Sequence, residues 1–379
     1  MNQDKTSPKY LDNASTTKVD DRVLKEMLPY FTMLFGNASS NHEYGKIAKQ
    51  AIEKARFQCA EIINSNPDEI IFTSGSTESI NLGIKGYLES NTEKGNHIIT
   101  VRTEHKAVLA TCEYLETKGY EVTYLDVDEN GLISLSELRE TVKENTLLIV
   151  IMYVNNETGV IQPINEIGKI ARENDVAFYC DATQAVGKIK VDIEKDLIDM
   201  LCFSGHKLNG PKGIGVLYKK NDIELTPLIH GGGQENGLRG GTYNTPSIVG
   251  FGKACEIAHQ DMNKNINKVK NLNEHLVNSL EKITPFIEVS KKHLRVPNIL
   301  NIIIPNLMSD IFIDKYSEVA VSNGSACNSS IMEESHVIKS MMQKKQYENK
   351  YLRISLDHFS TEEQIDIFIE VLNKHLNNA

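Results

Sequence analysis

The chain has 379 residues, with 41 Lys and Arg against 51 Asp and Glu, so its formal net charge is −10. This acidic balance gives no electrostatic reason to expect a nucleic acid or an anionic membrane as a direct partner. The N-terminus lacks an apolar stretch behind a basic start, and no apolar run approaches about 18 residues, so the sequence predicts a cytoplasmic protein without a signal peptide or a membrane span.

The six cysteines are far apart and form no Cys-x-x-Cys pair, which argues against a disulfide framework and against a zinc or cluster site. We therefore predict reduced thiols and no bound metal. Five of them lie in apolar or helical patterns, where a free cysteine is usually a small buried hydrophobe. Cys327 is the exception, because the surrounding SNGSACNSS (322–330) is small, polar and typical of an exposed loop.

From residue 69 to residue 219, short apolar runs alternate with helical patterns. Strands rich in Ile and Val that alternate with helices form βαβ units, so we predict an α/β fold with a mostly parallel, seven-stranded sheet covered on both faces. The predicted strands are EIIFTS (69–74), HIITV (97–101), EVTYLDV (121–127), LLIVIMYV (147–154), AFYCDA (177–182), DMLCFSG (199–205) and IGVLYK (214–219). The predicted helices lie at 76–90, 106–116, 134–142 and 164–174.

The remaining C-terminal part has a different pattern. A charged helical stretch (261–283) is followed by short strands at 298–304, 319–322 and 351–356 and by a last helix at 361–376. Ser360 and Glu363 have capping-box spacing at the start of that helix. We predict a large domain of residues 18–260 and a smaller α+β domain made of residues 1–17 and 261–379.

In an open α/β sheet, ligands bind beyond the carboxyl ends of the strands. The loop TSGSTES (73–79) follows a predicted strand and opens a helix. Its Ser76 and Thr77 hydroxyls and the free N–H groups of the helix start favour a phosphate, although the two residues are equally consistent with plain helix caps. His105, at the next strand end, is a candidate for stacking on a flat cofactor or moving protons, and the alternative is again a helix cap.

Three further strand ends carry polar side chains. Asn155 and Asn156 are candidates for binding a ligand hydroxyl or for shaping a turn. Asp181 directly follows an apolar strand, and a partly buried carboxylate needs a partner: either a protonated pyridine nitrogen or an Arg or Lys of the protein. Gln184 is close enough in sequence to reach the same ligand.

Lys207 lies between His206 and a glycine-rich stretch, in SGHKLNGPKGIG (204–215). Partial burial and a neighbouring histidine would lower its pKa, as Schiff-base formation requires. A phosphate-type turn, a ring-stacking histidine, an aspartate behind a strand and a lysine about 25 residues later together describe a pocket for pyridoxal 5′-phosphate (PLP).

The sequence resembles the cysteine desulfurases related to the bacterial enzymes of iron–sulfur cluster assembly, within the class V aminotransferase-like family of PLP-dependent transferases of fold type I. The resemblance covers nearly the whole chain, because its motifs occur in the family's order. These motifs are YLDNASTT, TSGSTES, TEHKAV, VNNETGV, DATQAVGK, FSGHKLNGPKGIG, HGGGQENGLRGGT, NGSACNSS and YLRISL. The resemblance makes the large domain PLP-binding and gives the small domain the loop with a catalytic cysteine.

The resemblance implies a role for each candidate residue. Lys207 would hold the cofactor as a Schiff base and move the substrate's Cα proton, with His105 as a further catalytic group that stacks on the ring. Asp181 would keep the pyridine nitrogen protonated. The phosphate ligands would be Ser76, Thr77, Ser204, His206 and, reaching the partner subunit of a homodimer, Thr242. The ring hydroxyl would contact Asn156 and Gln184, and the substrate would contact Asn13, Asn156 and Arg353.

Cys327 would take the sulfur of L-cysteine as a persulfide, leaving L-alanine, and pass it to an acceptor protein, an activity of the EC 2.8.1.7 type. Related desulfurases serve iron–sulfur assembly, tRNA thiolation or DNA phosphorothioation, so the acceptor stays open. The alternatives are a PLP-dependent selenocysteine lyase, an aminotransferase of the same fold, or a degenerate relative that acts only as a scaffold. The chain departs from the family pattern at Gln234, Asn236 and His358 and lacks a C-terminal extension, which are positions tied to partner choice.

Overall fold

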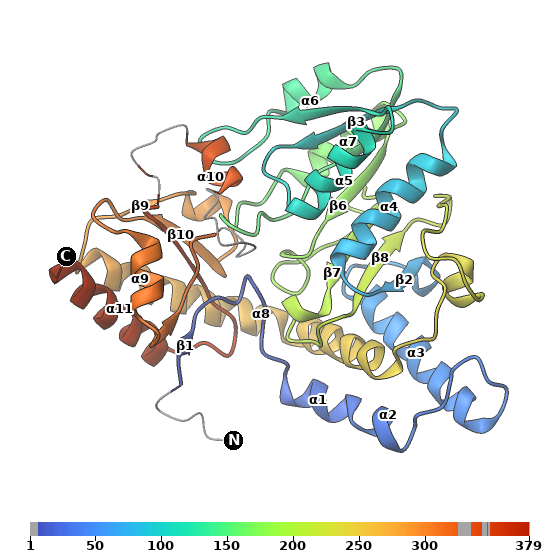
Figure 1. The fold of residues 1–379 in the computed structure, drawn as a ribbon, viewed down its shortest axis with the longest axis horizontal. Helices are drawn as coiled ribbons and strands as arrows, with labels where there is room; N and C mark the ends of the chain where they lie inside the picture. The colour runs from blue at the N-terminus through green and yellow to red at the C-terminus, as the bar shows by residue number, and fades with distance from the viewer. Residues whose placement is uncertain (1–6, 325–334, 343–346, 348, 379) are drawn as a thin grey trace.

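The computed structural model describes residues 7–324, 335–342, 347 and 349–378 (Figure 1). Cys327 therefore lies outside the described residues. No helix in the described part is long and apolar enough to cross a membrane. The chain forms a large seven-stranded sheet and, beside it, a three-stranded and a two-stranded sheet.

The large sheet has the strand order β2-β8-β7-β6-β5-β3-β4, and β8 runs antiparallel to both of its neighbours while the other pairs are parallel. This confirms the predicted α/β fold with a mostly parallel sheet. Its strands are β2 (Ile70–Thr73), β3 (His97–Val101), β4 (Glu121–Leu125), β5 (Thr146–Val150), β6 (Ala177–Asp181), β7 (Met200–Ser204) and β8 (Gly215–Lys219).

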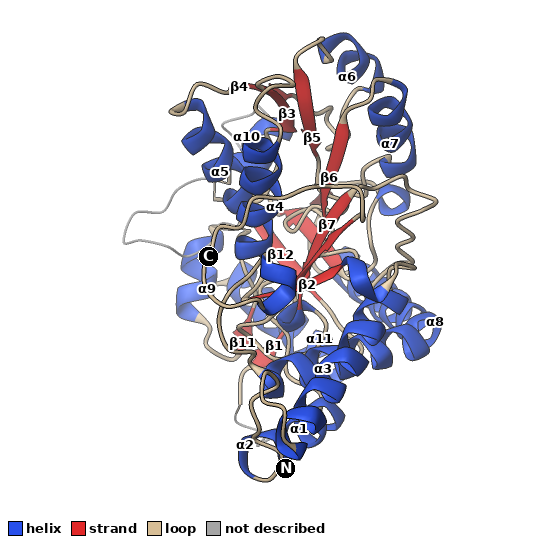
Figure 2. Ribbon diagram, turned by 90° about the vertical axis from the view of Figure 1, so that its right-hand side faces the viewer, coloured by secondary structure: helices blue, strands red, loops and turns tan. Residues whose placement is uncertain are grey.

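Helices cover the sheet on both sides because its strands are apolar on both faces. In β5, Leu148 and Val150 face one core and Ile149 faces the other. Figure 2 shows α4 and α5 on one side and α6 and α7 on the other. The helices are α3 (Glu43–Glu61), α4 (Ser76–Ser90), α5 (Lys106–Glu116), α6 (Leu135–Thr141), α7 (Ile164–Glu173) and α8 (Thr245–Glu281).

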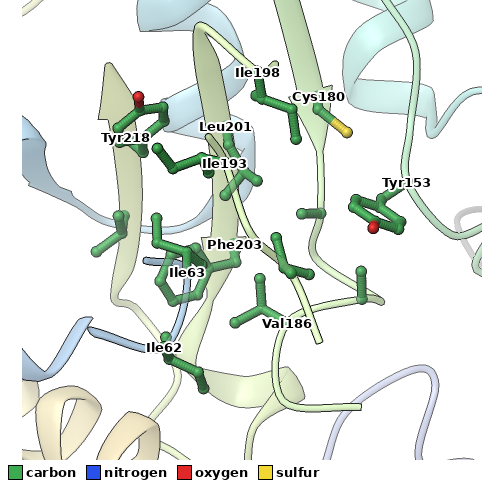
Figure 3. Close-up of a cluster of buried hydrophobic side chains, with 14 of the residues drawn as sticks. Ile62, Ile63, Tyr153, Cys180, Val186, Ile193, Ile198, Leu201, Phe203 and Tyr218 are labelled. Carbon is green, nitrogen blue, oxygen red and sulfur yellow. The ribbon is translucent and has the colours of Figure 1, made fainter. Parts of the chain in front are cut away.

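Part of the core between the large sheet, α3 and α8 is shown in Figure 3. Phe203 of β7 is fully buried there, and its ring lies 5.3 Å from that of Phe251 in α8. Cys180 of β6 belongs to the same core. Five cysteines are buried free thiols, as predicted. The core holds β6 and β7 rigidly, which matters because both strands end in predicted site residues.

The smaller sheets join the two ends of the chain. Strand β1 (Lys9–Tyr10) pairs in parallel with β11 (Val319–Ala320), so the N-terminal segment lies among the C-terminal elements (Figure 1). The three-stranded sheet is antiparallel, with β10 (Ile299–Ile303) between β9 (Ile287–Glu288) and β12 (Tyr351–Ser355). Helices α9 (Ser309–Lys315), α10 (His336–Met341) and α11 (Glu362–Asn377) complete this part.

Three details differ from the sequence expectations. The predicted elements did not include α1 (Asp21–Met27), α2 (Pro29–Thr32) or the full length of α3. Helix α8 runs unbroken through residue 260, so the proposed domain boundary falls inside a helix, and the division into two domains stays a prediction. The predicted capping box is wrong by one residue, because Thr361 and Gln364 form it while Ser360 bonds to Asp357.

Candidate active site

A cleft of about 1200 Å³ opens at the carboxyl ends of the large-sheet strands, between them and the small-sheet part. Its other wall is formed by Asp12, residues 14–16 and 321–324, and Arg353. The cleft brings together residues separated by up to 341 positions in sequence, from Asp12 to Arg353. The predicted site residues that line it are Ser76, Thr77, His105, Asn156, Asp181, Gln184, Ser204, His206, Lys207 and Arg353.

Lys207 ends a short 3-10 turn (Gly205–Lys207) directly after β7, which points its side chain into the cleft. Its Nζ donates to the backbone oxygens of Ala14 and Ser15, each at 2.6 Å. Burial, helped by the positive charge of Arg353, lowers the pKa of Lys207 to about 8. A large fraction of this amine is therefore neutral at mildly alkaline pH, as attack on an aldehyde requires.

Asp181 is the last residue of β6, with only 6% of its surface exposed. Its carboxylate accepts a hydrogen bond from the Thr183 backbone N–H at 3.0 Å and lies 3.5 Å from the Cys202 thiol. Within the described part of the chain, no Arg or Lys forms an ion pair with it. Among these residues the protein-side ion pair considered above is not formed, which leaves the carboxylate available to a cationic ligand group in the cleft.

His105 is the N-cap of α5, where its Nδ1 accepts a hydrogen bond from the Ala107 N–H at 3.1 Å. Capping therefore accounts for one ring nitrogen, and the rest of the imidazole remains on the cleft wall. Burial lowers the pKa of His105, with Asp181 acting in the opposite direction. The ring is mainly neutral near pH 7, with its proton on Nε2, so it is available both for stacking and for proton exchange.

The turn before α4 forms an anion-binding corner. Among the described residues, no side chain caps the first turn of this helix, so its N–H groups are available to a ligand such as a phosphate. The Ser76 hydroxyl bonds to that of Thr183 at 2.7 Å, and Ser204 lines the same corner. A Cβ at Gly215 would lie 2.7 Å from the Gly75 Cα, so only glycine lets β8 pass this closely behind the turn.

Arg353 lies on the opposite wall, in β12, with a side chain that is almost fully buried. One terminal nitrogen donates to Asp12 at 2.7 Å and to Ser15 at 2.7 Å, and the other donates to the backbone oxygen of Asn156 at 3.0 Å. Its Nε has no partner within the described residues. The guanidinium is thus held in place at the cleft wall, and its Nε is a buried donor without a described partner.

Gln184 is also buried, and both ends of its amide are engaged. Its Nε2 donates to the Ala14 backbone oxygen at 2.8 Å, and its Oε1 accepts from Lys188. Burial lowers the pKa of Lys188 to about 7, and the charge of Lys207 acts in the same direction. His206 bonds to Thr16 at 3.2 Å, and burial lowers its pKa to about 4, so its ring is neutral.

Two predicted residues lie elsewhere, and a third is not described. Asn13 donates its amide to Ser355 and lines a second, narrow cavity of about 50 Å³ behind Lys207. Thr242 is exposed and is not part of the cleft wall of its own chain. Cys327 is outside the described residues, but Gly324, the last described residue before it, lines the cleft. The roles assigned to these three residues stay predictions.

Sequence reasoning missed the charged groups beneath the cleft floor. Glu104 is completely buried, which raises the pKa of its carboxyl group well above the usual range; one oxygen accepts from the Met152 N–H at 2.5 Å. Glu157, next to Asn156, is likewise buried. Of these residues, Lys188 could most easily have been predicted from the sequence, because it lies four residues after Gln184 in DATQAVGK.

The chain matches the family model of aminotransferase class-V over residues 9–368. It belongs to this family. One relative, a "Cysteine desulfurase IscS" of Ehrlichia chaffeensis, is 45% identical over 362 residues, covering 94% of this chain and 88% of the relative. A solved structure of a "NIFS-LIKE PROTEIN" matches with a TM-score of 0.92 and 37% identity over 98% of this chain and 99% of the other. A structure of "SspA in complex with cysteine" matches with a TM-score of 0.83 and 39% identity, covering 93% and 99%.

Membership of the class-V family implies PLP as the cofactor. The residues present fit this group chemically, because the cleft combines an anion-binding corner, a lysine of lowered pKa and a buried carboxylate with no cationic partner in the described part. Those features match a phosphate, an aldehyde and a pyridine nitrogen, respectively.

Proposed function

We propose that the chain is a cysteine desulfurase that converts L-cysteine into L-alanine and transfers the sulfur, as a persulfide on Cys327, to an acceptor protein. The observation that carries this proposal is the shared cleft: Lys207 and Arg353 face the same space, and the chain toward Cys327 leaves from its wall at Gly324. The names of the relatives described above agree with this activity.

PLP, when bound, stabilises negative charge that develops at the substrate's Cα. Ser76, Thr77, Ser204 and His206 would hold its phosphate, with Thr242 of a second subunit completing the set. Asp181 would pair with the ring nitrogen, His105 would lie on the ring, and Asn156 and Gln184 would contact the ring hydroxyl. Lys207 would carry the covalent link.

The protein's own groups would then act on the substrate. Arg353 would bind the cysteine carboxylate, and Asp12 and Ser15 hold its guanidinium in place for this role. Lys207 would take the Cα proton and later return it. Its lowered pKa supports this role, because proton transfer is most effective when the pKa lies near the working pH. Asn13 is proposed as a further substrate contact.

Cys327 would attack the substrate's sulfur as a thiolate. An S–S bond forms, the C–S bond breaks with its electron pair going to carbon, and protonation of that carbon gives alanine. Cys327 follows Gly324 by three residues, so chain geometry limits its Cα to about 10 Å from the Gly324 Cα. This limit supports the proposal because Gly324 lines the cleft.

A homodimer is the proposed assembly. Thr242 would reach the phosphate of another subunit, since it is exposed and does not line the cleft of its own chain. Large apolar side chains are also exposed together along α1, α2, the following loop and α3, as expected for a surface that a second copy covers. They are Leu24, Leu28, Phe31, Met33, Phe35, Tyr44 and Phe57. The proposed location is the cytoplasm, where thiols stay reduced, and no direct contact with nucleic acid or membrane is proposed.

The test is product analysis with the purified protein. It should be yellow and should release alanine from L-cysteine, with sulfur detected on Cys327 by mass spectrometry. Cys327→Ala should keep the colour and form no persulfide. Keto-acid production would instead identify an aminotransferase, turnover restricted to selenocysteine would identify a selenocysteine lyase, and a colourless, inert protein would identify a scaffold.

A further inference from the structure

Glu157 has no part in the roles proposed above, yet it occupies a central place between the two sheets. Its side chain is buried, and its backbone is held from both sides. The Glu157 N–H donates to the Asn155 side chain at 2.9 Å, and the Asn301 side chain in β10 donates to the Glu157 backbone oxygen at 3.1 Å. The position of its carboxylate is therefore well defined.

One carboxylate oxygen of Glu157 meets two residues that are distant from it in sequence. Oε2 accepts a hydrogen bond from the Ser335 hydroxyl, and a Cβ on Gly324 would lie only 2.8 Å from the same oxygen. Gly324 also has φ +86°, a conformation that favours glycine. We call Gly324 and Ser335 the anchor pair, because they are the described residues on either side of segment 325–334, which contains Cys327.

The anchor pair is tied to the strand that carries Arg353. Ser322 and Arg353 exchange two backbone hydrogen bonds, at 3.2 and 2.6 Å, and the Ser335 N–H donates to the Tyr351 hydroxyl at 3.2 Å. The Ser335 hydroxyl also caps α10 by accepting from the Ile338 N–H at 3.1 Å. A single buried carboxylate thus bonds to Ser335 and lies against Gly324, and both of these residues adjoin the substrate wall of the cleft.

We propose that Glu157 is a positioning residue for sulfur transfer, which holds the anchor pair together so that the segment bearing Cys327 starts and ends beside the substrate site. This inference rests on the function proposed above. Fixing both ends of a short segment at one point restricts the space that its residues sample, which raises the effective concentration of the thiol near the substrate. Burial raises the pKa of Glu157 to about 7, while Ser335, Arg353 and Lys106 oppose that rise.

The test compares Glu157→Ala with Glu157→Gln in the PLP-loaded enzyme. The alanine variant loses the contact with Ser335, and we expect its single-turnover rate of persulfide formation on Cys327 to fall by about tenfold or more. The glutamine variant keeps an acceptor oxygen for Ser335 and should stay within about threefold of the wild type. Binding of L-cysteine is measured by the change in cofactor absorbance. It should be unchanged in both variants, because the Glu157 side chain has no hydrogen bond to Lys207 or Arg353 among the described residues.

A readout independent of activity is hydrogen exchange of the peptide 335–342. Release of Ser335 weakens the cap of α10, so its amides should exchange faster in Glu157→Ala than in Glu157→Gln. Asp196→Asn is the matched control, since Asp196 is also a buried carboxyl group bonded to a hydroxyl, that of Tyr153 at 3.0 Å, and has no hydrogen bond to the anchor pair. If the alanine variant does not fold, Ser335→Ala removes the same contact from the other side.

The inference would be overturned if Glu157→Ala and Ser335→Ala formed the persulfide at the wild-type rate. It would also be overturned if Asp196→Asn lost as much of that rate as Glu157→Ala. Absence of any persulfide in the wild-type enzyme would instead overturn the proposed function. The two failures are therefore distinguishable.

Discussion

The two walls of the cleft are built differently. On the large-sheet wall, Asp181 ends β6 and Lys207 lies in the turn after β7, the parallel neighbour of β6, so the register of these two strands brings them together. On the small-sheet wall, Arg353 depends on contacts with Asp12, Ser15 and Asn156, which lie 341, 338 and 197 residues away in sequence. The first wall is fixed by one sheet, and the second by the meeting of three chain segments.

This structural difference corresponds to different functions of the two walls. Groups that hold the cofactor lie where the fold is most rigid, because their strands are buried in two apolar cores. Groups that meet the substrate and its sulfur lie where separate segments join and where small changes in packing alter their positions. Substitutions on the first wall should therefore change the chemistry itself, and those on the second should change binding, transfer and stability.

The largest effect is expected at the amine of the large-sheet wall. Lys207→Ala removes both the covalent attachment and the Cα base, so alanine formation should fall by roughly 10³-fold or more. Lys188→Ala is the matched control, since Lys188 is a second buried lysine whose pKa is also lowered. Its variant should remain yellow. Cofactor absorbance and alanine release measure both, and a colourless Lys188→Ala with a yellow Lys207→Ala would reverse the assignment.

On the other side, Glu157 should make stability depend on pH. Its pKa is raised to about 7, so folding favours the protonated carboxyl, and that stabilisation is complete below the unfolded value of 4.5 and is lost as pH rises through 7. The free energy of unfolding of the wild type, minus that of Glu157→Gln, should therefore fall by about 3 kcal/mol between pH 4 and pH 8. Urea denaturation at several pH values measures this difference, and a constant value would contradict the prediction.

The large-sheet wall of the cleft could be predicted from the sequence, whereas the contacts of the small-sheet wall could not. The seven large-sheet strands and the positions of Asp181 and Lys207 follow from local patterns, because the end of the adjacent apolar strand locates each of these two residues in the sequence. The contact between Glu157 and Ser335 spans 178 residues and depends on where β12 pairs with β10, which no local pattern specifies.

Shorter-range errors have equally physical causes. The capping box was misplaced because Ser360 and Thr361 are both good N-caps, and Asp357 binds Ser360 in the folded chain. Helix α1 was missed because part of its apolar surface, including Leu24, is exposed in the single chain rather than packed on a core. Pattern reasoning assumes that all apolar residues of a helix share one buried face, and Leu24 departs from the face on which Val23 and Met27 are buried.

A smaller effect is expected from a conservative change on the substrate wall. Arg353→Lys keeps the charge but loses the planar pair of donors, so KM for L-cysteine should rise by about tenfold while the cofactor stays bound. Steady-state kinetics and the absorbance spectrum check both parts. An unchanged KM would show that the substrate carboxylate binds elsewhere.

The smallest effect links the two walls through charge. Because the positive charge of Arg353 helps to lower the pKa of Lys207 to about 8, removing it in Arg353→Met should raise that pKa toward the ordinary lysine value. Attachment of PLP to the apoprotein needs the neutral amine, so its rate should rise with pH through about 8 in the wild type and reach its plateau at higher pH in the variant. At pH 8 the variant should be several-fold slower. Stopped-flow absorbance of PLP mixing across pH 6.5 to 10 measures the midpoint. Identical midpoints would mean that burial alone sets the reactivity of the lysine and that the two walls act independently.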